Sequence, residues 1–318
     1  MITKEILDII EKSNKIGVTF HQSPDGDSLG SSTALVQGLR LLSKDEYLIS
    51  KEIIPDTFTY LKCSEEITGL KDYVQEETDL VIVVDVHNRS YVENIDFIEK
   101  SKRKVIIDHH RRSPDMIGGA LLNYIEVYAS STSEMITEVI QYMLKDPKLT
   151  QTEAEGLLAG IYMDTKGFSF KTGVRTFEAA SFLRNIGADT IEVKKMFTDN
   201  LEDYLLIAET IKSAKVNPSN STAIAVCPDN VDTVIVAKSA DEMLNISGIL
   251  AGFVLAKIND DIYISGRSVG DINVQVVLEE LGGGGHMNIA GTKMSGLTIE
   301  EVIEKLEESI KKHLKVGE

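Results

Sequence analysis

The residues in this chain best suited to chemistry are aspartates and histidines gathered in four short stretches. The chain has only six histidines, and four of them lie in these stretches. Carboxylate and imidazole groups without thiolates suit a borderline-hard divalent cation such as Mn²⁺. The four stretches contain His21, Asp25 and Asp27; Asp85 and His87; Asp108, His109 and His110; and Asp164.

Each stretch also has an ordinary structural explanation. Asp25-Gly-Asp27 before a helix is a common turn with an acidic N-cap. Asp85 after a strand is a common loop residue, and His109-His110 is compatible with an exposed pair. Their joint occurrence favours a metal site, because so many carboxylates in one crevice repel one another unless cations neutralise them. More ligands are present than one ion takes, so we expect two ions that share a bridging carboxylate.

The elements that must position these groups form alternating strands and helices. Three of the stretches directly follow predicted strands, whereas Asp164 closes a predicted helix at 152–163. In open parallel sheets, ligands bind beyond the carboxyl ends of the strands, so we expect the three strand ends to converge in one crevice. The continuous apolar run of the second strand is typical of a sheet covered on both faces. The three strands are 16–20, 80–84 and 105–107.

The length of 318 residues predicts about two domains. The first, at 1–188, is an α/β domain with a parallel sheet. A connector at 189–216 contains a helix at 189–213, and the polar stretch 215–221 marks the boundary to a smaller α/β domain at 217–318. Further helices are predicted at 2–13, 28–42, 132–145, 176–186, 272–281 and 298–314, and further strands at 223–226, 249–257 and 261–265.

Charge and composition narrow the class of partner. The net charge is −17, from 33 basic and 50 acidic residues. Long nucleic acid is bound through many Lys and Arg contacts to phosphates, so we expect none here, whereas a small phosphorylated ligand is compatible. The distant Cys63 and Cys227 fit thiols in a reducing compartment, and neither a transmembrane run nor a secretory signal is visible. We expect a cytoplasmic protein with no membrane partner, and a homodimer is left open.

Together the four stretches resemble the DHH phosphoesterase family, named after the tripeptide at 108–110. The motif His-x-x-Pro-Asp-x-Asp at 21–27, the strand-terminal Asp85 and Asp164-Thr165 occur in the family's order. The segment Gly-Gly-Gly-Gly-His at 282–286 resembles the DHH-associated domain that follows the catalytic domain in this family. The resemblance covers essentially the whole chain.

The resemblance implies a role for each of these residues. Asp108 would orient a neighbouring ligand rather than bind metal. His110 would face the substrate phosphate as a hydrogen-bond donor or general acid. For His87, a structural role and a catalytic role are both open. The implied cofactor is a pair of divalent ions, with Mn²⁺ preferred and Asp85 as the bridge. The implied ligands are His21, Asp25 and Asp85 for one ion, and Asp27, Asp85, His109 and Asp164 for the other.

Several stretches look closest to the catalytic module of GdpP-type cyclic di-AMP phosphodiesterases. In the soluble oligoribonuclease branch, Gly-Gly-Gly-His is usually followed by a basic residue, whereas Met287 and Asn288 follow His286 here. The opening at 21–30, with no membrane or sensory segment before it, looks instead like that stand-alone branch. The stretches closest to the GdpP type are 108–112, 124–134, 164–168, 172–177 and 271–276.

The residues expected to bind substrate have structural explanations as well. Arg267 suits a phosphate clamp because a guanidinium matches two phosphate oxygens; the alternative is a surface strand arginine. One glycine suffices for a helix C-cap at Gly282, whereas four indicate backbone that approaches a ligand closely. Ser131 with Glu134 forms a capping box, and the same helix N-terminus can instead receive a phosphate. The expected substrate-binding residues are Ser131, Arg267, Asn273, Gly283, Gly284, Gly285 and His286.

The function that follows from the resemblance is a metal-dependent phosphodiesterase. It would hydrolyse cyclic di-AMP, linear pApA or both, by two-metal hydroxide attack at phosphorus. The alternative is a nano-oligoribonuclease that also dephosphorylates 3′-phosphoadenosine 5′-phosphate. A family II inorganic pyrophosphatase would lack the glycine run. A receptor that binds a cyclic dinucleotide without turnover would not need a complete set of metal ligands.

Overall fold

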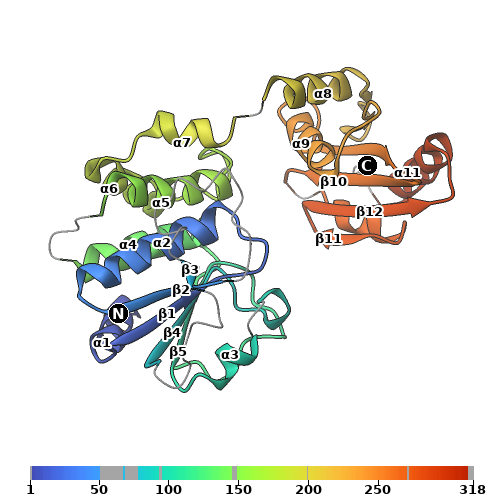
Figure 1. The fold of residues 1–318 in the computed structure, drawn as a ribbon. Coiled ribbons are helices and arrows are strands. Elements are labelled where there is room, and N and C mark those ends of the chain that lie inside the picture. The colour runs from blue at the N-terminus through green and yellow to red at the C-terminus, as the bar shows by residue number, and fades with distance from the viewer. Residues whose placement is uncertain are drawn as a thin grey trace. The chain divides into compact units, whose positions relative to one another are not determined.

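The computed structural model describes residues 2–50, 67–68, 78–92, 95–144, 149–198, 200–270 and 272–313. The chain divides into two compact units, Met1–Thr198 and Asp199–Glu318 (Figure 1). Cys63 lies outside the described residues, and so does Asp271, the first residue of the stretch 271–276. Within the described residues, no helix is both long enough and apolar enough to span a bilayer.

The first unit is built on a parallel six-stranded sheet with the order β3-β2-β1-β4-β5-β6. The direction in which strands are added reverses between β1 and β4, which pair with Ile16 opposite Leu80. In doubly wound sheets this reversal is the point where ligands bind, beyond the carboxyl ends of the strands. The strands are β1 (Lys15–Thr19), β2 (Asp45–Ile49), β3 (Ile67–Thr68), β4 (Leu80–Val84), β5 (Lys104–Asp108) and β6 (Leu122–Ile125).

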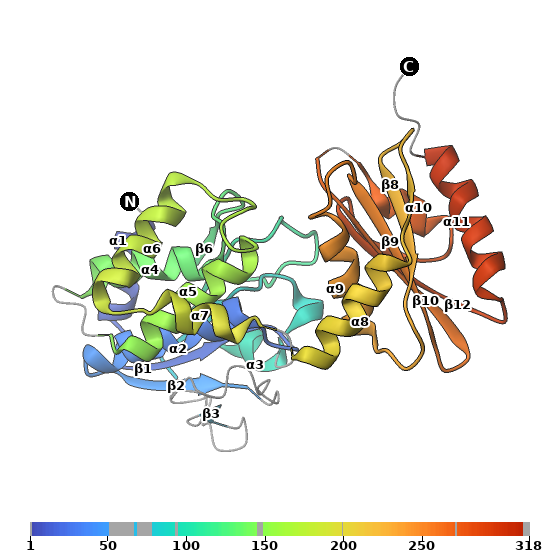
Figure 2. The same ribbon diagram turned by 90° about the horizontal axis from the view of Figure 1, so that it is seen from above.

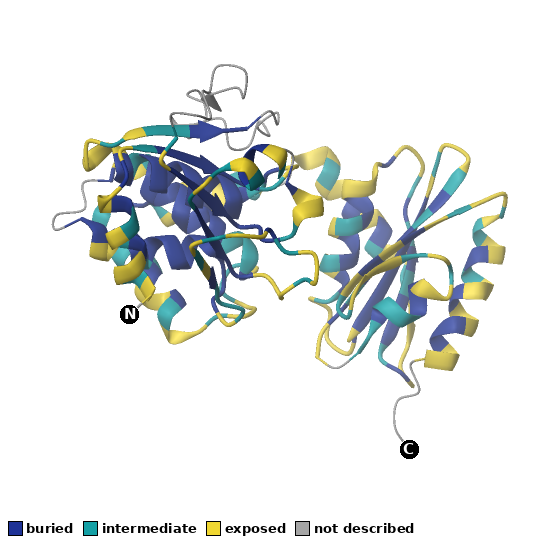
Figure 3. Cartoon of the chain, turned by 90° about the horizontal axis from the view of Figure 1, so that it is seen from below, coloured by how far each residue is buried: buried dark blue, intermediate teal, exposed yellow. Residues whose placement is uncertain are grey.

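Helices cover both faces of this sheet (Figures 1 and 2). In β4, Leu80 and Ile82 belong to the core formed with α1, α2, α4 and α5, whereas Val81 and Val83 pack with Phe97 of α3. The strand is therefore buried on both faces, as its continuous apolar run predicts (Figure 3). The helices are α1 (Ile2–Glu11), α2 (Gly26–Leu41), α3 (Ile95–Lys100), α4 (Thr132–Met143), α5 (Gln151–Asp164) and α6 (Val174–Ile186), and a 3-10 turn, η4, spans Arg89–Tyr91.

Close packing of α2 against α5 fixes the geometry near the predicted ligands. A Cβ atom on Gly30 would lie 2.1 Å from the carbonyl oxygen of Gly156, so the two helix backbones touch. A Cβ on Gly160 would lie 2.8 Å from Oδ1 of Asp27. Only glycine permits such approaches. They hold α5, which ends at Asp164, against the first turn of α2.

The connector differs from the sequence prediction. The single helix predicted at 189–213 is two helices, α7 (Thr190–Met196) and α8 (Leu201–Lys212). Each begins at its own N-cap, because the side chain of Asp189 accepts from the N–H of Ile191 at 2.8 Å and that of Asn200 accepts from Asp203 at 2.8 Å. A second capping residue inside a continuous apolar pattern is the signal that separates the two helices.

The second unit has a mixed sheet with the order β11-β12-β10-β9-β8-β7, in which only β8 and β9 are parallel. Val254 packs in the core on the α8 and α9 face, and Phe253 packs in the core on the α10 and α11 face. The prediction of a second, smaller α/β unit is confirmed. Its elements are β7 (Lys215–Asn217), β8 (Thr222–Val226), α9 (Thr233–Met243), β9 (Ala251–Ile258), β10 (Asp261–Ser268), α10 (Val274–Glu279), β11 (Gly284–His286), β12 (Ile289–Ser295) and α11 (Ile299–His313).

Candidate metal centre

The first group of ligand atoms lies where β1 leads into α2. Asp25 is the N-cap of α2, and its Oδ1 accepts the N–H groups of Asp27 and Ser28, each at 3.1 Å. His21 Nε2 lies 3.6 Å from this Oδ1 and 3.4 Å from Oδ2 of Asp85. His21, Asp25 and Asp85 thus offer ligand atoms that all lie within 4.8 Å of one another. The capping role predicted for Asp25 is confirmed, and the same carboxylate belongs to the group.

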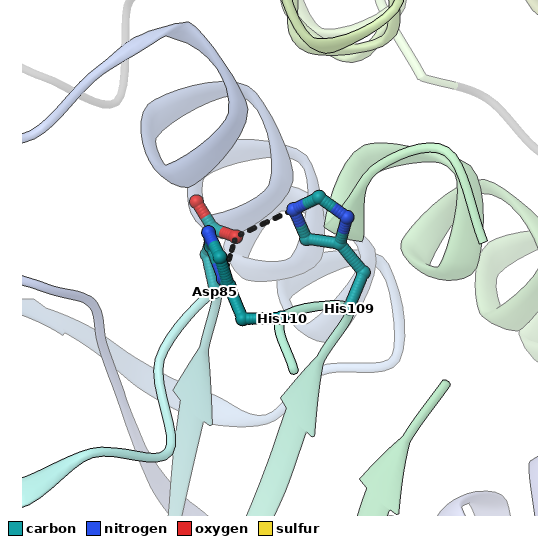
Figure 4. A group of neighbouring side chains, drawn as sticks. All are labelled: Asp85, His109 and His110. Carbon is teal, nitrogen blue, oxygen red and sulfur yellow. Dashed lines mark ion pairs between the residues drawn. The ribbon is translucent and has the colours of Figure 1, made fainter. Parts of the chain in front are cut away.

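The second group joins α2, β5 and α5. Asp27, His109 and Asp164 offer ligand atoms within 4.8 Å of one another. His109 Nε2 lies 3.0 Å from Asp164 Oδ2 and 3.8 Å from Asp27 Oδ2. It also lies 3.7 Å from Oδ1 of Asp85, and Figure 4 marks this ion pair by a dashed line. Asp85 therefore directs one oxygen to each group, Oδ2 to His21 and Oδ1 to His109, and this is the geometry expected of a bridging ligand.

The backbone of Asp85 departs from ordinary strand geometry. Its φ is 61°, in the left-handed region that non-glycine residues rarely adopt. The N–H of Asp85 still donates to the carbonyl of Ile107 at 2.9 Å, so β4 and β5 stay paired up to this residue. Strained backbone of this kind is concentrated at functional sites.

Each of the two groups contains two carboxylates and one imidazole, so negative charge is in excess, and the pKa values of its members reflect that excess. Burial raises the pKa of Asp27 and of Asp85. Burial acts to lower the pKa of His21, but its two neighbouring carboxylates outweigh it and raise this pKa to about 11. The pKa of His109 rises to about 10 in the same way, because Asp164 and the other nearby carboxylates outweigh burial. Without metal ions, protons supply the compensating charge.

The imidazole of His109 tests whether a metal ion fits here. This side chain is 5% exposed, and neither of its ring nitrogens makes a well-aligned hydrogen bond in the described part of the chain, although Nε2 lies 3.0 Å from Oδ2 of Asp164 as an ion pair. A buried polar group without a well-aligned partner is costly. A cation held among these atoms would bind Nε2 together with the carboxylate oxygens. Nitrogen and carboxylate oxygen donors without sulfur also match the ligand preferences of Mn²⁺, so the residues fit the implied metal ions.

The N-terminus of α4 holds two of the carboxylates in place. The N–H groups of Thr132 and Ser133 donate to Oδ2 and Oδ1 of Asp27, both at 2.7 Å, and the hydroxyl of Thr132 donates to Oδ1 of Asp85 at 2.9 Å. Ser131 is the N-cap and accepts the N–H of Glu134 at 3.0 Å, which confirms one half of the predicted capping box. The carboxylate of Glu134 accepts from the N–H and hydroxyl of Ser130 rather than from the N–H of Ser131. A phosphate at this helix N-terminus would have to compete with Asp27, because the carboxylate of Asp27 already accepts the N–H groups of Thr132 and Ser133.

Asp108 lies behind the ligand groups and is fully buried. Its Oδ2 pairs with Nδ1 of His87, and its Oδ1 pairs with Nδ1 of His110 at 2.8 Å. His87 Nε2 accepts the N–H of Ser113 at 2.9 Å, so the His87 proton resides on Nδ1 and points to Asp108. Burial acts to raise the pKa of Asp108, yet the bonds from the two histidines lower it overall. The geometry supports the structural role for His87.

His110 is the histidine most open to solvent in this group, with a side chain that is 56% exposed. Asp108 fixes its Nδ1, which leaves Nε2 for an external partner. Burial acts to lower the pKa of His110, but the hydrogen bond to Asp108 and the charge of Asp85 outweigh it and raise this pKa. The protonated form that can donate to a phosphate is therefore favoured.

In the second unit, the predicted substrate residues gather at one end of the sheet. Arg267 on β10 and His286 on β11 both pair with Ile289 on β12, so they stand in one row on the same face. The N–H of Val274 donates to the carbonyl of Met287 at 2.8 Å, which places Asn273 beside the same hairpin. The residues predicted from separate motifs are thus neighbours.

Arg267 and Asn273 also have partners inside the second unit. The guanidinium of Arg267 lies 3.3 Å from Oδ2 of Asp241 and donates to the hydroxyl of Ser265 at 2.9 Å. The side chain of Asn273 caps α10 by accepting the N–H of Gln275 at 3.0 Å. A phosphate at Arg267 would therefore compete with a carboxylate already in place.

The glycine run is not a free loop but part of a strand at the edge of the sheet, and the predicted role of Gly283, Gly284 and Gly285 in substrate binding stays a prediction. Gly284–His286 is strand β11, paired with β12. A Cβ atom on Gly283 would lie 2.3 Å from the carbonyl oxygen of Gly291, and one on Gly285 would lie 2.4 Å from that of Ile289. Gly285 also has a φ of 147°. The close approach that these two glycines permit is an approach to β12.

Fold and site together define an α/β protein with adjoining groups of Asp and His side chains able to hold metal ions, at the switch point of a parallel sheet. Residues 15–161 match the model of the DHH family, N-terminal domain, and residues 219–312 match the DHHA1 domain. The chain belongs to the DHH family and carries the DHHA1 domain. The resemblance drawn from the sequence motifs is confirmed.

Among curated proteins, the cyclic-di-AMP phosphodiesterase GdpP of Geobacillus thermodenitrificans is 37% identical over 100% of this chain and 50% of its own length. The cyclic-di-AMP phosphodiesterase PdeA of Listeria monocytogenes is 36% identical over 96% and 49%. The chain thus spans about half the length of these relatives. The bifunctional oligoribonuclease and PAP phosphatase NrnA of Thermus thermophilus is 24% identical over 98% of this chain and 94% of that protein.

Solved structures show the same fold. An exopolyphosphatase-related protein from Bacteroides fragilis has a TM-score of 0.85 and 24% identity, covering 98% of this chain and 95% of that one. RecJ from Thermus thermophilus in complex with Mn²⁺ has a TM-score of 0.53 and 16% identity, covering 98% of this chain and 54% of that one.

Proposed function

We propose that this chain is a metal-dependent phosphodiesterase that hydrolyses cyclic di-AMP, its linear product pApA, or both. The observation that carries the proposal is the position of Asp85, which directs one carboxylate oxygen to each of the two ligand groups. The relatives named cyclic-di-AMP phosphodiesterases, at 37% and 36% identity, support this substrate class.

The proposed cofactor is a pair of divalent metal ions, Mn²⁺ by preference. When bound, such ions acidify the attacking water and neutralise charge on the phosphoryl oxygens. The chain's own residues would hold them without rearrangement of the carboxylates, since α4 already orients Asp27 and Asp85. We assign His21, Asp25 and Asp85 to one ion and Asp27, Asp85, His109 and Asp164 to the other.

In this proposal, His110 acts on the substrate. Its exposed Nε2 would donate a hydrogen bond to a phosphoryl oxygen or a proton to the leaving oxygen, as a general acid does. Asp108 is a positioning residue that holds Nδ1 of His110, and His87 in turn holds Asp108. This chain of contacts keeps the imidazole of His110 beside Asp85, with its Nδ1 3.7 Å from Oδ1 of Asp85.

The second candidate function is that of an oligoribonuclease and 3′-phosphoadenosine 5′-phosphate phosphatase. It is favoured by one observation, that the alignment with such a protein covers 94% of its length. The two candidates differ in whether the chain hydrolyses the cyclic dinucleotide or only linear oligonucleotides and 3′-phosphoadenosine 5′-phosphate. We further propose that Arg267, Asn273 and His286 bind nucleotide phosphate or base.

The experiment compares initial rates with Mn²⁺ for cyclic di-AMP, cyclic di-GMP, pApA and 3′-phosphoadenosine 5′-phosphate. We expect a higher kcat/KM for cyclic di-AMP than for 3′-phosphoadenosine 5′-phosphate. A preference for 3′-phosphoadenosine 5′-phosphate, or for pApA and other di- to pentaribonucleotides with no turnover of cyclic di-AMP, would establish the second candidate instead. Binding of cyclic di-AMP without turnover of any substrate would show a receptor.

A further inference from the structure

A pocket of about 700 Å³ opens on the first unit and has none of the predicted metal ligands in its lining. Three aromatic residues, Tyr128, Phe168 and Phe177, line it together with the polar Lys171 and Thr172. Tyr128 is 90% exposed and Phe177 is 57% exposed. Exposed apolar patches framed by polar groups mark binding sites, and this volume is in the range of small-molecule pockets.

The aromatic wall of this pocket is built in advance. The rings of Phe168 and Phe177 are stacked, with centroids 5.8 Å apart and planes 15° apart. Tyr162 supports Phe168 from behind by an edge contact, with centroids 6.3 Å apart, and itself stacks on Phe197. A ligand therefore meets an ordered flat surface.

Both walls of the pocket begin next to the metal centre. On one side, Thr165 follows Asp164 and its carbonyl accepts the N–H groups of Ser169 and Phe170 at 2.9 and 2.8 Å, which folds the segment 166–170 back onto the end of α5. Lys166, Phe168 and Lys171 take positive φ values in this part of the chain, a strained path that must be held in place.

On the other side, the N–H of Glu126 donates to the carbonyl of Asp108 at 2.9 Å, two residues before Tyr128. The segment 126–128 therefore leaves the sheet at the level of the Asp-His-His tripeptide. The two segments that form the pocket walls therefore start beside Asp164 and Asp108, in the same unit as the metal groups.

We propose that this pocket binds the second nucleobase of a dinucleotide, the base on the nucleoside that is released from the attacked phosphorus, by stacking against Phe177 and Tyr128. The inference rests on the proposed function. Stacking on an aromatic side chain contributes favourably to the binding free energy of any nucleobase, because every base has a π-face. A chain with a net charge of −17 gains little from general attraction to phosphates, so stacking is the contact that suits it.

The test uses the full chain and the variants Phe177→Ala and Tyr128→Ala. Tyr142→Ala is the matched control, because Tyr142 is a similarly exposed aromatic residue (73%) that does not line the pocket. Two substrates are compared, pApA and adenosine 5′-(methyl phosphate), a phosphodiester with a single base. We expect Phe177→Ala and Tyr128→Ala to raise KM for pApA by about tenfold and to leave KM for the single-base substrate unchanged. The control Tyr142→Ala should leave KM for both substrates unchanged. Phe177→Trp should restore KM.

A binding measurement separates this inference from the proposed activity. A hydrolysis-resistant phosphorothioate dinucleotide that carries 2-aminopurine as one base loses fluorescence when that base stacks. We expect quenching with the native chain and with Tyr142→Ala, and weaker quenching with Phe177→Ala, whether or not the chain turns over pApA. Equal quenching in all variants, or equal losses on both substrates, would overturn the pocket assignment. Dissociation of a dimer by Phe177→Ala would show that a second copy, not a base, covers this surface.

Discussion

The hydroxyl of Thr132 donates a hydrogen bond of 2.9 Å to Oδ1 of Asp85, the carboxylate that faces both ligand groups. The N–H of the same residue donates to Asp27 at 2.7 Å. A single residue at the start of α4 thus connects two buried carboxylates, that of Asp85, which both metal ions would share, and that of Asp27, which one of them would bind. Replacing a group that orients metal ligands in this way typically costs about 10–100-fold in metal affinity or activity.

Replacing Thr132 by Val should therefore weaken metal binding while the fold is kept. We expect Mn²⁺ affinity to fall by about tenfold or more, because Asp85 loses its donor, and Thr132→Ser should retain it. Thr137→Val is the matched control, since the Thr137 hydroxyl is equally buried on α4 but bonds to the carbonyl of Ser133. Calorimetric titration with Mn²⁺ measures the difference. Unchanged affinity in Thr132→Val would contradict the orienting role.

Replacing Asp85 by Asn should abolish activity and the binding of at least one metal ion. The change is suited to the site, because asparagine tolerates the left-handed backbone that Asp85 adopts at φ 61°. Burial raises the pKa of Asp85, so above that pKa the ionised carboxylate destabilises the metal-free fold, and the variant should unfold at the same temperature or higher.

Thermal unfolding with and without Mn²⁺ checks this prediction. The native chain should gain stability by mass action, about 2.7 kcal/mol when free metal is a hundredfold above Kd. The variant should gain less. Full metal occupancy together with near-native turnover would refute the bridging assignment.

The sequence predicts the convergence of the site because the physics of a parallel sheet is strict. His21, Asp85 and His109 follow strands that are neighbours in the sheet, and the carboxyl ends of such strands share one edge. By contrast, β12 has a weak pattern, with alternate residues exposed and a glycine inside, and α9 begins with the β-branched run Thr233 to Val236, which favours a strand. Neither element is predicted from the sequence.

Other features depend on contacts between distant segments that no local pattern encodes. The bond from Ser133 to Asp27 joins residues 106 positions apart, and that from Ser113 to His87 requires the chain to return beside β4. The glycine run indicates close backbone approach, but the strand approached, β12, is visible only in the fold. Tyr128 and Phe177 lie in stretches that resemble the GdpP type, and that resemblance is the signal that was available for the aromatic pocket.

Metal binding should release protons. In the metal-free chain the pKa of His21 is about 11 and that of His109 is about 10, so both imidazoles are protonated at pH 8. A metal ion binds only neutral imidazole, so apparent affinity should rise with pH up to about 10. Both pKa values lie above the ordinary value for histidine. Their contribution to the stability of the metal-free fold is therefore complete below about pH 6.5 and is lost as pH rises through 10 to 11.

Titration of the chain with Mn²⁺ at pH 8, in two buffers with different enthalpies of ionisation, measures the proton release directly. We expect about two protons per chain, and about one for His21→Ala. Binding enthalpies that do not depend on the buffer would show that the imidazoles are already neutral.

The last prediction separates the two units. Every predicted metal ligand lies within Met1–Thr198, and the core clusters of this unit are distinct from those of Asp199–Glu318. A fragment ending at Thr198 should therefore fold and bind Mn²⁺ with the affinity and stoichiometry of the full chain. It should bind cyclic di-AMP more weakly, because Arg267 and His286 are missing. Calorimetry on both proteins, with Arg267→Ala in the full chain as the single-residue counterpart, measures the two affinities. Equal nucleotide affinity in the fragment would remove the DHHA1 domain from the substrate site.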